Sequence, residues 1–184
     1  MTVSGFTHRL AVEADIAALR IVMDAAISGP LSAFLDAERV QASRAIMGID
    51  TQLIADRTYF VIEEDGVVAG CGGWSRRATM YGGDHTSGRE PALLTPGVDA
   101  ARVRAMYTHP DFLRRGVGRI ILDLCETAAR AEGFDRVELA ATMGGEPLYR
   151  AAGYRDIERF EDDRGGAPVP LIRMGKSLIE DPTP

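Results

Sequence analysis

The sequence predicts one α/β or α+β domain in which helices cover a β-sheet. Amphipathic helical segments and short apolar strands are mixed along the whole chain, with no internal repeat and no clear linker. Asp65-Gly66 lies between two apolar runs, which is a strong signal for a two-residue hairpin and therefore for antiparallel strands. The chain has 184 residues, 46% of them apolar, so it is long enough to bury one core.

The first half of the chain combines helical and strand patterns. Ile16, Leu19 and Val22 recur at helical spacing after the N-cap candidate Asp15. In order, the expected elements are the strand Thr7–Val12, a helix from Asp15 to the stop at Gly29-Pro30, the helical region Leu31–Ile54, and the hairpin strands Tyr59–Glu64 and Val67–Trp74. Ala78–Gly97 is rich in glycine and polar residues and predicts a long mobile loop, a kind of segment that often carries function.

The second half continues with a strand, a longer helix and three more strands. The expected elements are the strand Arg102–Thr108, the helix Arg119–Ala131, the strand Val137–Ala141, the short helix Gly145–Ala152, and the strands Tyr154–Phe160 and Val169–Met174. The longer helix has an apolar face that includes Ile121 and Cys125, and a polar face that includes Asp123 and Glu126. Gly133 suits its C-terminal cap.

Composition excludes several classes of protein. The net charge of −6 argues against nucleic acid as a partner, because such binding needs a broad basic surface. Cys71 and Cys125 lie in apolar runs and are expected to be buried thiols, and no cysteine–histidine cluster has zinc spacing, so no metal site is predicted. The N-terminus has no apolar signal core, and no apolar run reaches membrane-spanning length. A cytoplasmic protein is expected.

The stretch Met106–Arg119, MYTHPDFLRRGVGR, predicts a pyrophosphate-binding turn between a strand and a helix. Amides at the start of a helix point outward without partners, and the helix dipole adds partial positive charge there. Gly116 and Gly118 let an anion approach the main chain closely because they lack a Cβ. Arg114, Arg115 and Arg119 add positive charge around the same turn.

Two common phosphate loops fit poorly. A nucleoside-triphosphate loop needs Gly-x-x-x-x-Gly-Lys-Ser/Thr, which this sequence does not contain. A dinucleotide loop needs a third glycine after Gly116-Val117-Gly118, but Ile121 stands there, and the loop follows a hairpin late in the chain.

The turn resembles the signature of the GNAT acyltransferase superfamily, Gln/Arg-x-x-Gly-x-Gly/Ala between a strand and a helix. The matching string is Leu113-Arg114-Arg115-Gly116-Val117-Gly118, in which Leu113 departs from the pattern. Downstream, Glu146–Tyr154, EPLYRAAGY, resembles the later family motif of a tyrosine-bearing helix followed by Gly-Tyr; Thr142 stands where the family often has Asn. The order of elements also matches, so the resemblance implies one GNAT-type domain over 1–184, with its core at about 7–174.

The resemblance implies a mixed, mostly antiparallel sheet with helices on both faces, whose two central parallel strands, Arg102–Thr108 and Val137–Ala141, splay apart. It implies acetyl-CoA as the acyl donor and an amine as the acceptor. The diphosphate would lie against Arg114, Arg115, Gly116, Val117, Gly118 and Arg119. Unpaired backbone at Met106, Tyr107 and Thr108 would hold the pantetheine arm, and an amide there could hold the developing oxyanion.

Tyr149 matches the family tyrosine that protonates the departing thiolate. In water this transfer is uphill, because tyrosine has a pKa near 10 and a thiol a pKa near ~8.5. A lysine-like amine is neutral in only about one part in 2,500 at pH 7. The site therefore needs a desolvating pocket or a base, for which Glu138, Asp84, His85, Glu90 and water are the candidates.

Several alternatives stay open at this stage. The acceptor could be a small amine, an antibiotic-like molecule, or a protein lysine or N-terminus. A non-catalytic coenzyme A-binding module would keep Gly116 and Gly118 without needing Tyr149. A nucleotide-binding regulator is a third candidate, and homodimerisation is undecided by the sequence.

Overall fold

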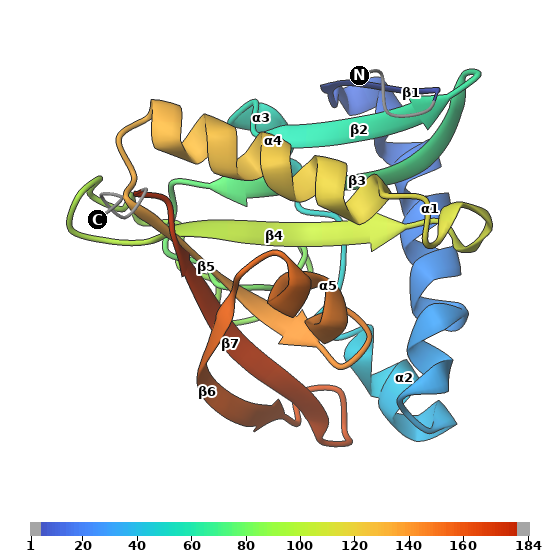
Figure 1. The fold of residues 1–184 in the computed structure, drawn as a ribbon. Helices are drawn as coiled ribbons and strands as arrows, with labels where there is room; N and C mark the ends of the chain where they lie inside the picture. The colour runs from blue at the N-terminus through green and yellow to red at the C-terminus, as the bar shows by residue number, and fades with distance from the viewer. Residues whose placement is uncertain (1–4, 180–184) are drawn as a thin grey trace.

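A seven-stranded sheet in the order β1-β2-β3-β4-β5-β7-β6 forms the centre of the computed structural model, which describes residues 5–179 (Figure 1). The strands are β1 (Phe6–Leu10), β2 (Tyr59–Glu64), β3 (Val67–Ser75), β4 (Ala101–Thr108), β5 (Arg136–Thr142), β6 (Arg155–Asp162) and β7 (Val169–Ser177). The α-helices are α1 (Ile16–Ser28), α2 (Ala37–Ser43), α3 (Thr51–Ala55), α4 (Val117–Ala131) and α5 (Glu146–Ala151). The predicted domain bounds 1–184 extend at both ends beyond the described residues.

The sheet is antiparallel except between its central strands, β4 and β5. These two pair in parallel only at Ala101 with Val137 and at Arg102 with Glu138, as far as the described residues show. Both strands continue well past these pairs, so they separate over most of their length and leave backbone groups without a sheet partner. The splayed central pair predicted from the sequence is confirmed.

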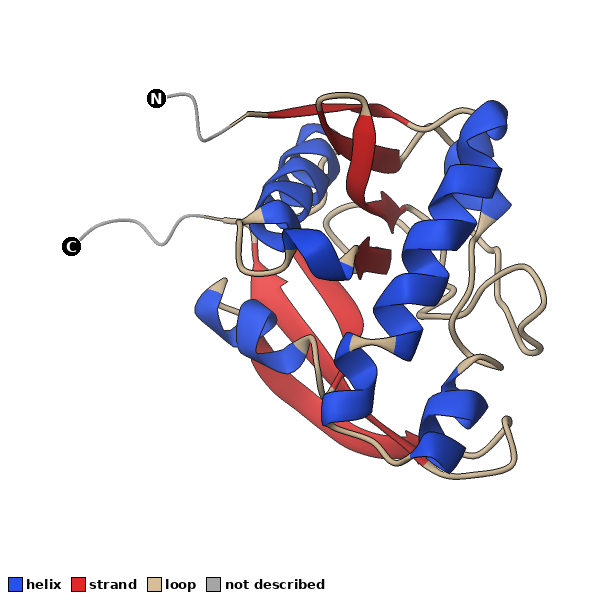
Figure 2. Ribbon diagram, turned by 90° about the vertical axis from the view of Figure 1, so that its right-hand side faces the viewer, coloured by secondary structure: helices blue, strands red, loops and turns tan. Residues whose placement is uncertain are grey.

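Helices cover both faces of the sheet (Figures 1 and 2). On one face, α4 and α5 pack over the central strands, and buried residues of α4 such as Ile121 and Leu122 join the main core cluster. On the other face, α1 lies against β3 and β4 through Leu19 and Val22, in a second cluster. The two faces are thus separately packed, and the gap between β4 and β5 connects them.

Two helix boundaries and the burial of one residue differ from the sequence predictions for identifiable reasons. The helix predicted from Arg119 begins at Val117, because the left-handed residue Gly116 directly precedes it. The helical region predicted over Leu31–Ile54 is divided into a 3₁₀ turn, α2 and α3, since Asp36 and Asp50 each cap a new helix with their side chains. Glu126, expected on the polar face of α4, is buried and accepts a 2.6 Å hydrogen bond from Lys176.

The continuous helical stretch Glu13–Ala33 is long and apolar enough to cross a membrane by length and composition alone. The expectation that no apolar run reaches this length was therefore wrong. Such a stretch near an N-terminus is weak evidence for a membrane span, because core helices of globular domains pass the same test. Here Leu19, Val22 and Ile27 are buried in the domain.

Candidate active site at the strand splay

The glycine turn before α4 is open on the side where its amides point. Gly116 has a φ of +89°, which favours glycine, and no atom lies within 4 Å of the position that a Cβ would occupy there. The first intrahelical bond runs from the Ile120 amide to the Gly116 carbonyl at 3.0 Å. The amides of Val117, Gly118 and Arg119 precede it and find no backbone acceptor within residues 5–179. This turn presents an open row of donors to an anion.

The three arginines of the turn differ in whether a carboxylate neutralises their charge. Arg115 donates to the Glu64 carboxylate at 2.6 and 2.9 Å and lies over two phenylalanine rings. Arg119 pairs with Asp123 at 3.0 Å along the exposed side of α4. Arg114 is exposed in the left-handed region, with a φ of +63°, and has no ion-pair partner among the described residues. Arg114 is thus the arginine whose charge is least neutralised.

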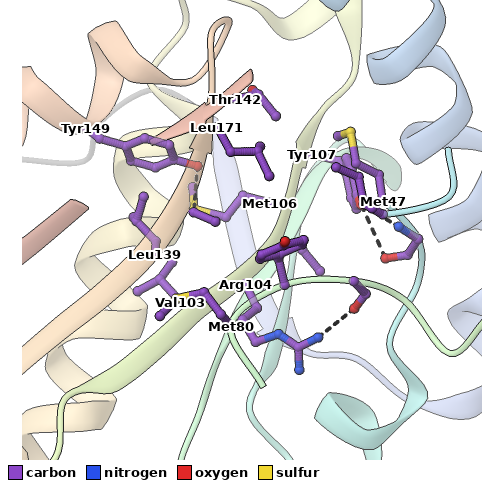
Figure 3. Close-up of a pocket in the computed structure, with 16 residues that line it drawn as sticks. Met47, Met80, Val103, Arg104, Met106, Tyr107, Leu139, Thr142, Tyr149 and Leu171 are labelled. Carbon is purple, nitrogen blue, oxygen red and sulfur yellow. Dashed lines mark hydrogen bonds between the residues drawn. The ribbon is translucent and has the colours of Figure 1, made fainter. Parts of the chain in front are cut away.

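A cavity of about 90 Å³ lies where β4 and β5 separate (Figure 3). Its walls come from both strands, from Tyr149 of α5 and Leu171 of β7, and from two loop segments, Ile46–Gly48 and Met80–Gly82. The cavity therefore lies within the gap of the sheet, with walls from both faces, and the two loop segments cover it on the side away from α4.

Three tyrosines line this cavity, and their hydroxyls have different partners. The Tyr107 hydroxyl accepts from the Gly48 amide at 3.0 Å and donates to the carbonyl of the same residue at 3.2 Å. The Tyr81 hydroxyl donates to Asp162 at 2.6 Å. The Tyr149 hydroxyl contacts only the sulfur of Met106, at 3.8 Å, among the atoms described (Figure 3). Because a thioether is a weak acceptor, Tyr149 carries the one hydroxyl of these three tyrosines that is free to donate elsewhere.

The surroundings of Tyr149 keep it protonated. Its ring is half-buried and meets the Tyr154 ring edge to face, with centroids 5.9 Å apart. Burial raises the pKa of Tyr149 above the ordinary value of 10, so the hydroxyl is neutral throughout the physiological pH range. The side chain is therefore a proton donor in the gap of the sheet.

The end of β4 places the predicted strand residues on both sides of the sheet. The Met106 side chain lies with the core under α4, while Tyr107 joins the cluster on the α1 side. Thr108 pairs with Gly70 of β3. Ala105 has a φ of +51° next to a register shift against β3, so the strand bulges beside the cavity. The bulge turns backbone groups of this segment away from the regular ladder.

Glu138, one of the candidate bases, is engaged by two arginines. It accepts from Arg102 at 3.0 Å and from Arg173 at 2.9 and 2.6 Å. It does not line the cavity.

The other three candidates lie in the long loop and are exposed. Asp84 accepts from the Thr51 amide at 3.0 Å, and His85 Nε2 is 2.7 Å from the Arg44 carbonyl. Glu90 likewise does not line the cavity. The walls of the cavity contain no carboxylate and no imidazole within the described part of the chain, so water is the one candidate that this chamber could hold.

A buried charge cluster behind the cavity was not predicted from the sequence. Arg104 on β4 is 4% exposed, pairs with the fully buried Asp50, and donates to the Gly82 carbonyl at 2.6 Å. Arg89 of the long loop also donates to Asp50, at 2.6 Å. Burial lowers the pKa of Arg104, although the neighbouring Asp50 opposes this effect. These residues come from three distant segments, and no local pattern links them.

Comparison with known proteins identifies the family. The model of the acetyltransferase (GNAT) family matches residues 30–154. This chain belongs to the GNAT family. No curated protein sequence matches it.

Solved GNAT structures share the fold over nearly the whole chain. A GCN5-related N-acetyltransferase from Rhodopseudomonas palustris has a TM-score of 0.71 at 21% identity, covering 96% of this chain and 98% of that one. YncA from Salmonella typhimurium, solved with its cofactor acetyl-CoA, has a TM-score of 0.63 at 20% identity, covering 98% of both chains. The ribosomal-protein-S18-alanine N-acetyltransferase from Escherichia coli has a TM-score of 0.58 at 17% identity, covering 96% of both.

GNAT proteins use acetyl-CoA as the acyl donor, and the geometry of this chain fits that molecule. The turn at Gly116 leaves space and donors for a diphosphate where a Cβ would otherwise stand. The separated strands leave backbone unpaired beside the cavity, where an amide-bearing arm can hydrogen-bond. The protein is thus an acetyltransferase of the GNAT family by sequence and fold.

Proposed function

We propose that this GNAT protein moves the acetyl group of acetyl-CoA directly to an amine. The observation that carries the proposal is the neutral, weakly engaged hydroxyl of Tyr149 in the gap of the sheet. No cysteine stands in a position to form an acyl intermediate, because both thiols are buried and burial raises the pKa of each. Direct attack by the amine is the simplest route that these residues support.

The donor would be held at two places. Amides of Gly116, Val117 and Gly118, together with the side chains of Arg114, Arg115 and Arg119, would bind the diphosphate. Backbone of Met106, Tyr107 and Thr108 would hold the pantetheine arm. When bound, the donor supplies an activated thioester.

Tyr149 would give its proton to the leaving sulfur, and water in the gap would carry back to the phenolate the proton that the attacking nitrogen loses as the amide forms. A thiol in the same gap is also buried, and burial raises thiol pKa values in this protein, as Cys71 shows with a pKa raised to about 12. Tyrosine and thiol are therefore shifted in the same direction, and the transfer stays only modestly uphill. General-acid catalysis of this kind typically raises the rate about 10²–10⁴-fold. Because the pKa of the tyrosine lies somewhat above that of the thiol, we expect a value near the low end of this range.

The amine has to lose its proton before it attacks. Because the cavity wall has no carboxylate or imidazole in the described residues, we propose that desolvation does most of this work. Burial in an apolar chamber disfavours the ammonium form and so lowers the pKa of the amine. Water in the gap would accept the proton.

Hydroxyl deletion at Tyr149 tests the proposal. Tyr149→Phe should lower kcat about 100-fold while leaving the Kd of acetyl-CoA unchanged by calorimetry. Tyr154→Phe is the matched control, because it removes a neighbouring buried hydroxyl that has no hydrogen-bond partner among the described atoms. Equal turnover by Tyr149→Phe and wild type would contradict the catalytic role. Tight binding of acetyl-CoA without acetylation of any amine would instead favour a coenzyme A-binding module.

A further inference from the structure

We infer that the acceptor is a small monoamine with an apolar body, bound in the chamber on the far side of the strand splay. The inference rests on the proposed acetyl transfer and specifies the substrate class of the same site. It is carried by the way three distant segments close the chamber, and by the chemistry of its wall.

The long loop is fixed against the segment that precedes α3. The Asp84 amide donates to the Ile49 carbonyl at 3.0 Å, and the Thr86 hydroxyl donates to the Ala45 carbonyl at 3.0 Å. The backbones touch at Gly83, where an added Cβ would lie 2.6 Å from the Cα of Gly48. The two loops that form the chamber wall are therefore packed against each other at these contacts.

A second set of contacts ties the long loop to the turn between β6 and β7. Tyr81 donates to Asp162 at 2.6 Å, and Arg164 pairs with the same carboxylate at 2.6 Å while its guanidinium lies over the Tyr81 ring. Arg164 also donates to the Ser87 carbonyl. The turn itself is seated on α2, because an added Cβ at Gly165 would lie 2.1 Å from the Ala42 carbonyl oxygen.

These contacts make the far side of the site a small chamber instead of a surface groove. Its volume of about 90 Å³, which the acceptor would share with the thioester end of the donor, leaves room for a small molecule only. An extended peptide needs an open groove or a free sheet edge along its length. The loops occupy that space, which favours a free small amine over a protein segment.

Most of the side chains that line the chamber are apolar, and most of its polar side chains already have hydrogen-bond or ion-pair partners. Met47, Met80 and Leu171 supply much of the surface (Figure 3). The Arg104 guanidinium pairs with Asp50, which also binds Arg89, and Arg89 in turn pairs with Asp84, so the two cations of this cluster are already matched by two carboxylates. A second ammonium on the acceptor would therefore be desolvated in the chamber with no unpaired carboxylate in the described wall to neutralise it. Polyamines and aminoglycosides are disfavoured for this reason.

A matched acceptor pair tests the inference with the wild-type protein. Butylamine and 1,4-diaminobutane share a carbon chain and differ by one ammonium, and mass spectrometry of the acetylated products gives kcat/KM for each. We expect butylamine to be favoured more than about 100-fold, and to be favoured also over a lysine-containing tripeptide blocked at both ends. Equal or faster acetylation of the diamine or the tripeptide would overturn the inference while leaving acetyl transfer itself in place. Failure to acetylate any amine would overturn both.

Changing one wall residue tests the electrostatic reason for the preference. Met80 is half-buried and lines the chamber, so Met80→Glu introduces a carboxylate of similar size. It should raise kcat/KM for 1,4-diaminobutane at least about tenfold and lower it for butylamine, whereas Met80→Gln, the uncharged control, should leave the preference for the monoamine in place. A diamine preference that responds equally to both variants would show that charge does not decide acceptor choice.

Discussion

Replacing Gly116 by alanine separates backbone strain from loss of the donor site. At a φ of +89°, a side chain destabilises the folded state by roughly 1–2 kcal/mol. Alanine also reduces the conformational entropy of the unfolded chain, which offsets roughly 0.4–1 kcal/mol of this loss. Gly66 in the β2–β3 hairpin is the matched control, because it has a φ of +80° and also no atom within 4 Å of its Cβ position. Both variants should therefore lose about 1 kcal/mol of stability, which lowers Tm by about 2–4 °C.

Only the variant at Gly116 should lose affinity for acetyl-CoA. The new methyl group would stand in the open space beside the amides that begin α4 and hold the diphosphate away from them. Losing one charge-assisted hydrogen bond costs about 1.5–3 kcal/mol, which corresponds to a Kd raised about 10- to 100-fold. Gly66→Ala should keep the wild-type Kd.

Calorimetry gives the two Kd values, and thermal unfolding gives an independent check. Acetyl-CoA at 100 times the wild-type Kd should stabilise the wild type by about 2.7 kcal/mol. The same concentration should stabilise Gly116→Ala by only about 1.4 kcal/mol if binding is tenfold weaker, and by about 0.4 kcal/mol if it is hundredfold weaker. A Gly116→Ala protein with the wild-type Kd would refute the placement of the diphosphate at this turn.

Three further predictions concern the residues around the chamber. Tyr107→Phe leaves the buried Gly48 amide without its 3.0 Å acceptor and should cost about 1–3 kcal/mol in urea unfolding; no change would mean that water replaces the hydroxyl. Burial alone would raise the pKa of Asp162, but bonds from Arg164 and Tyr81 outweigh it and lower the pKa to about 2. The ionised form therefore contributes about 2 kcal/mol above pH 4 that is lost as the pH falls toward 2, and Asp162→Asn should flatten acid unfolding there. The thiol of Cys71 is buried with a pKa raised to about 12, so native protein at pH 8 should resist thiol reagents until it is denatured.

The open turn before α4 could be predicted because its geometry is local, while its role in binding the donor stays a prediction. Gly116 stands directly before an amphipathic helix and Gly118 lies in its first turn. A left-handed residue followed by amides without partners needs no distant segment to bind an anion. The hairpin at Asp65-Gly66 was equally local, and the observed strands match its predicted start and end to within one residue. The bulge at Ala105 was missed, since alanine does not indicate a φ of +51° in the way that glycine does.

The acceptor side was much less predictable because it depends on contacts between remote segments. Arg104 meets Asp50 across 54 positions, and Tyr81 meets Asp162 across 81. A single sequence contains no signal for such pairs. The candidate bases were chosen as polar residues near the expected site, but in the structure they do not line the cavity. Glu138, for example, pairs with two arginines on the neighbouring strands.

This contrast has a physical basis in what the two halves of the site must recognise. A diphosphate can be bound by backbone amides, so its site needs only a turn with particular dihedral angles. Because glycine adopts these angles most readily, the spacing of glycines in the sequence predicts such a turn. The acceptor is selected by the shape and charge of a chamber, and these arise only when loops, β7 and β4 pack together. Acceptor choice can therefore change through single wall residues such as Met80 while the donor turn stays the same. The Met80→Glu and Gly116→Ala variants should accordingly act independently, one on the choice of amine and the other on the Kd of acetyl-CoA, and a double variant whose effects are not the sum of the two would contradict this division.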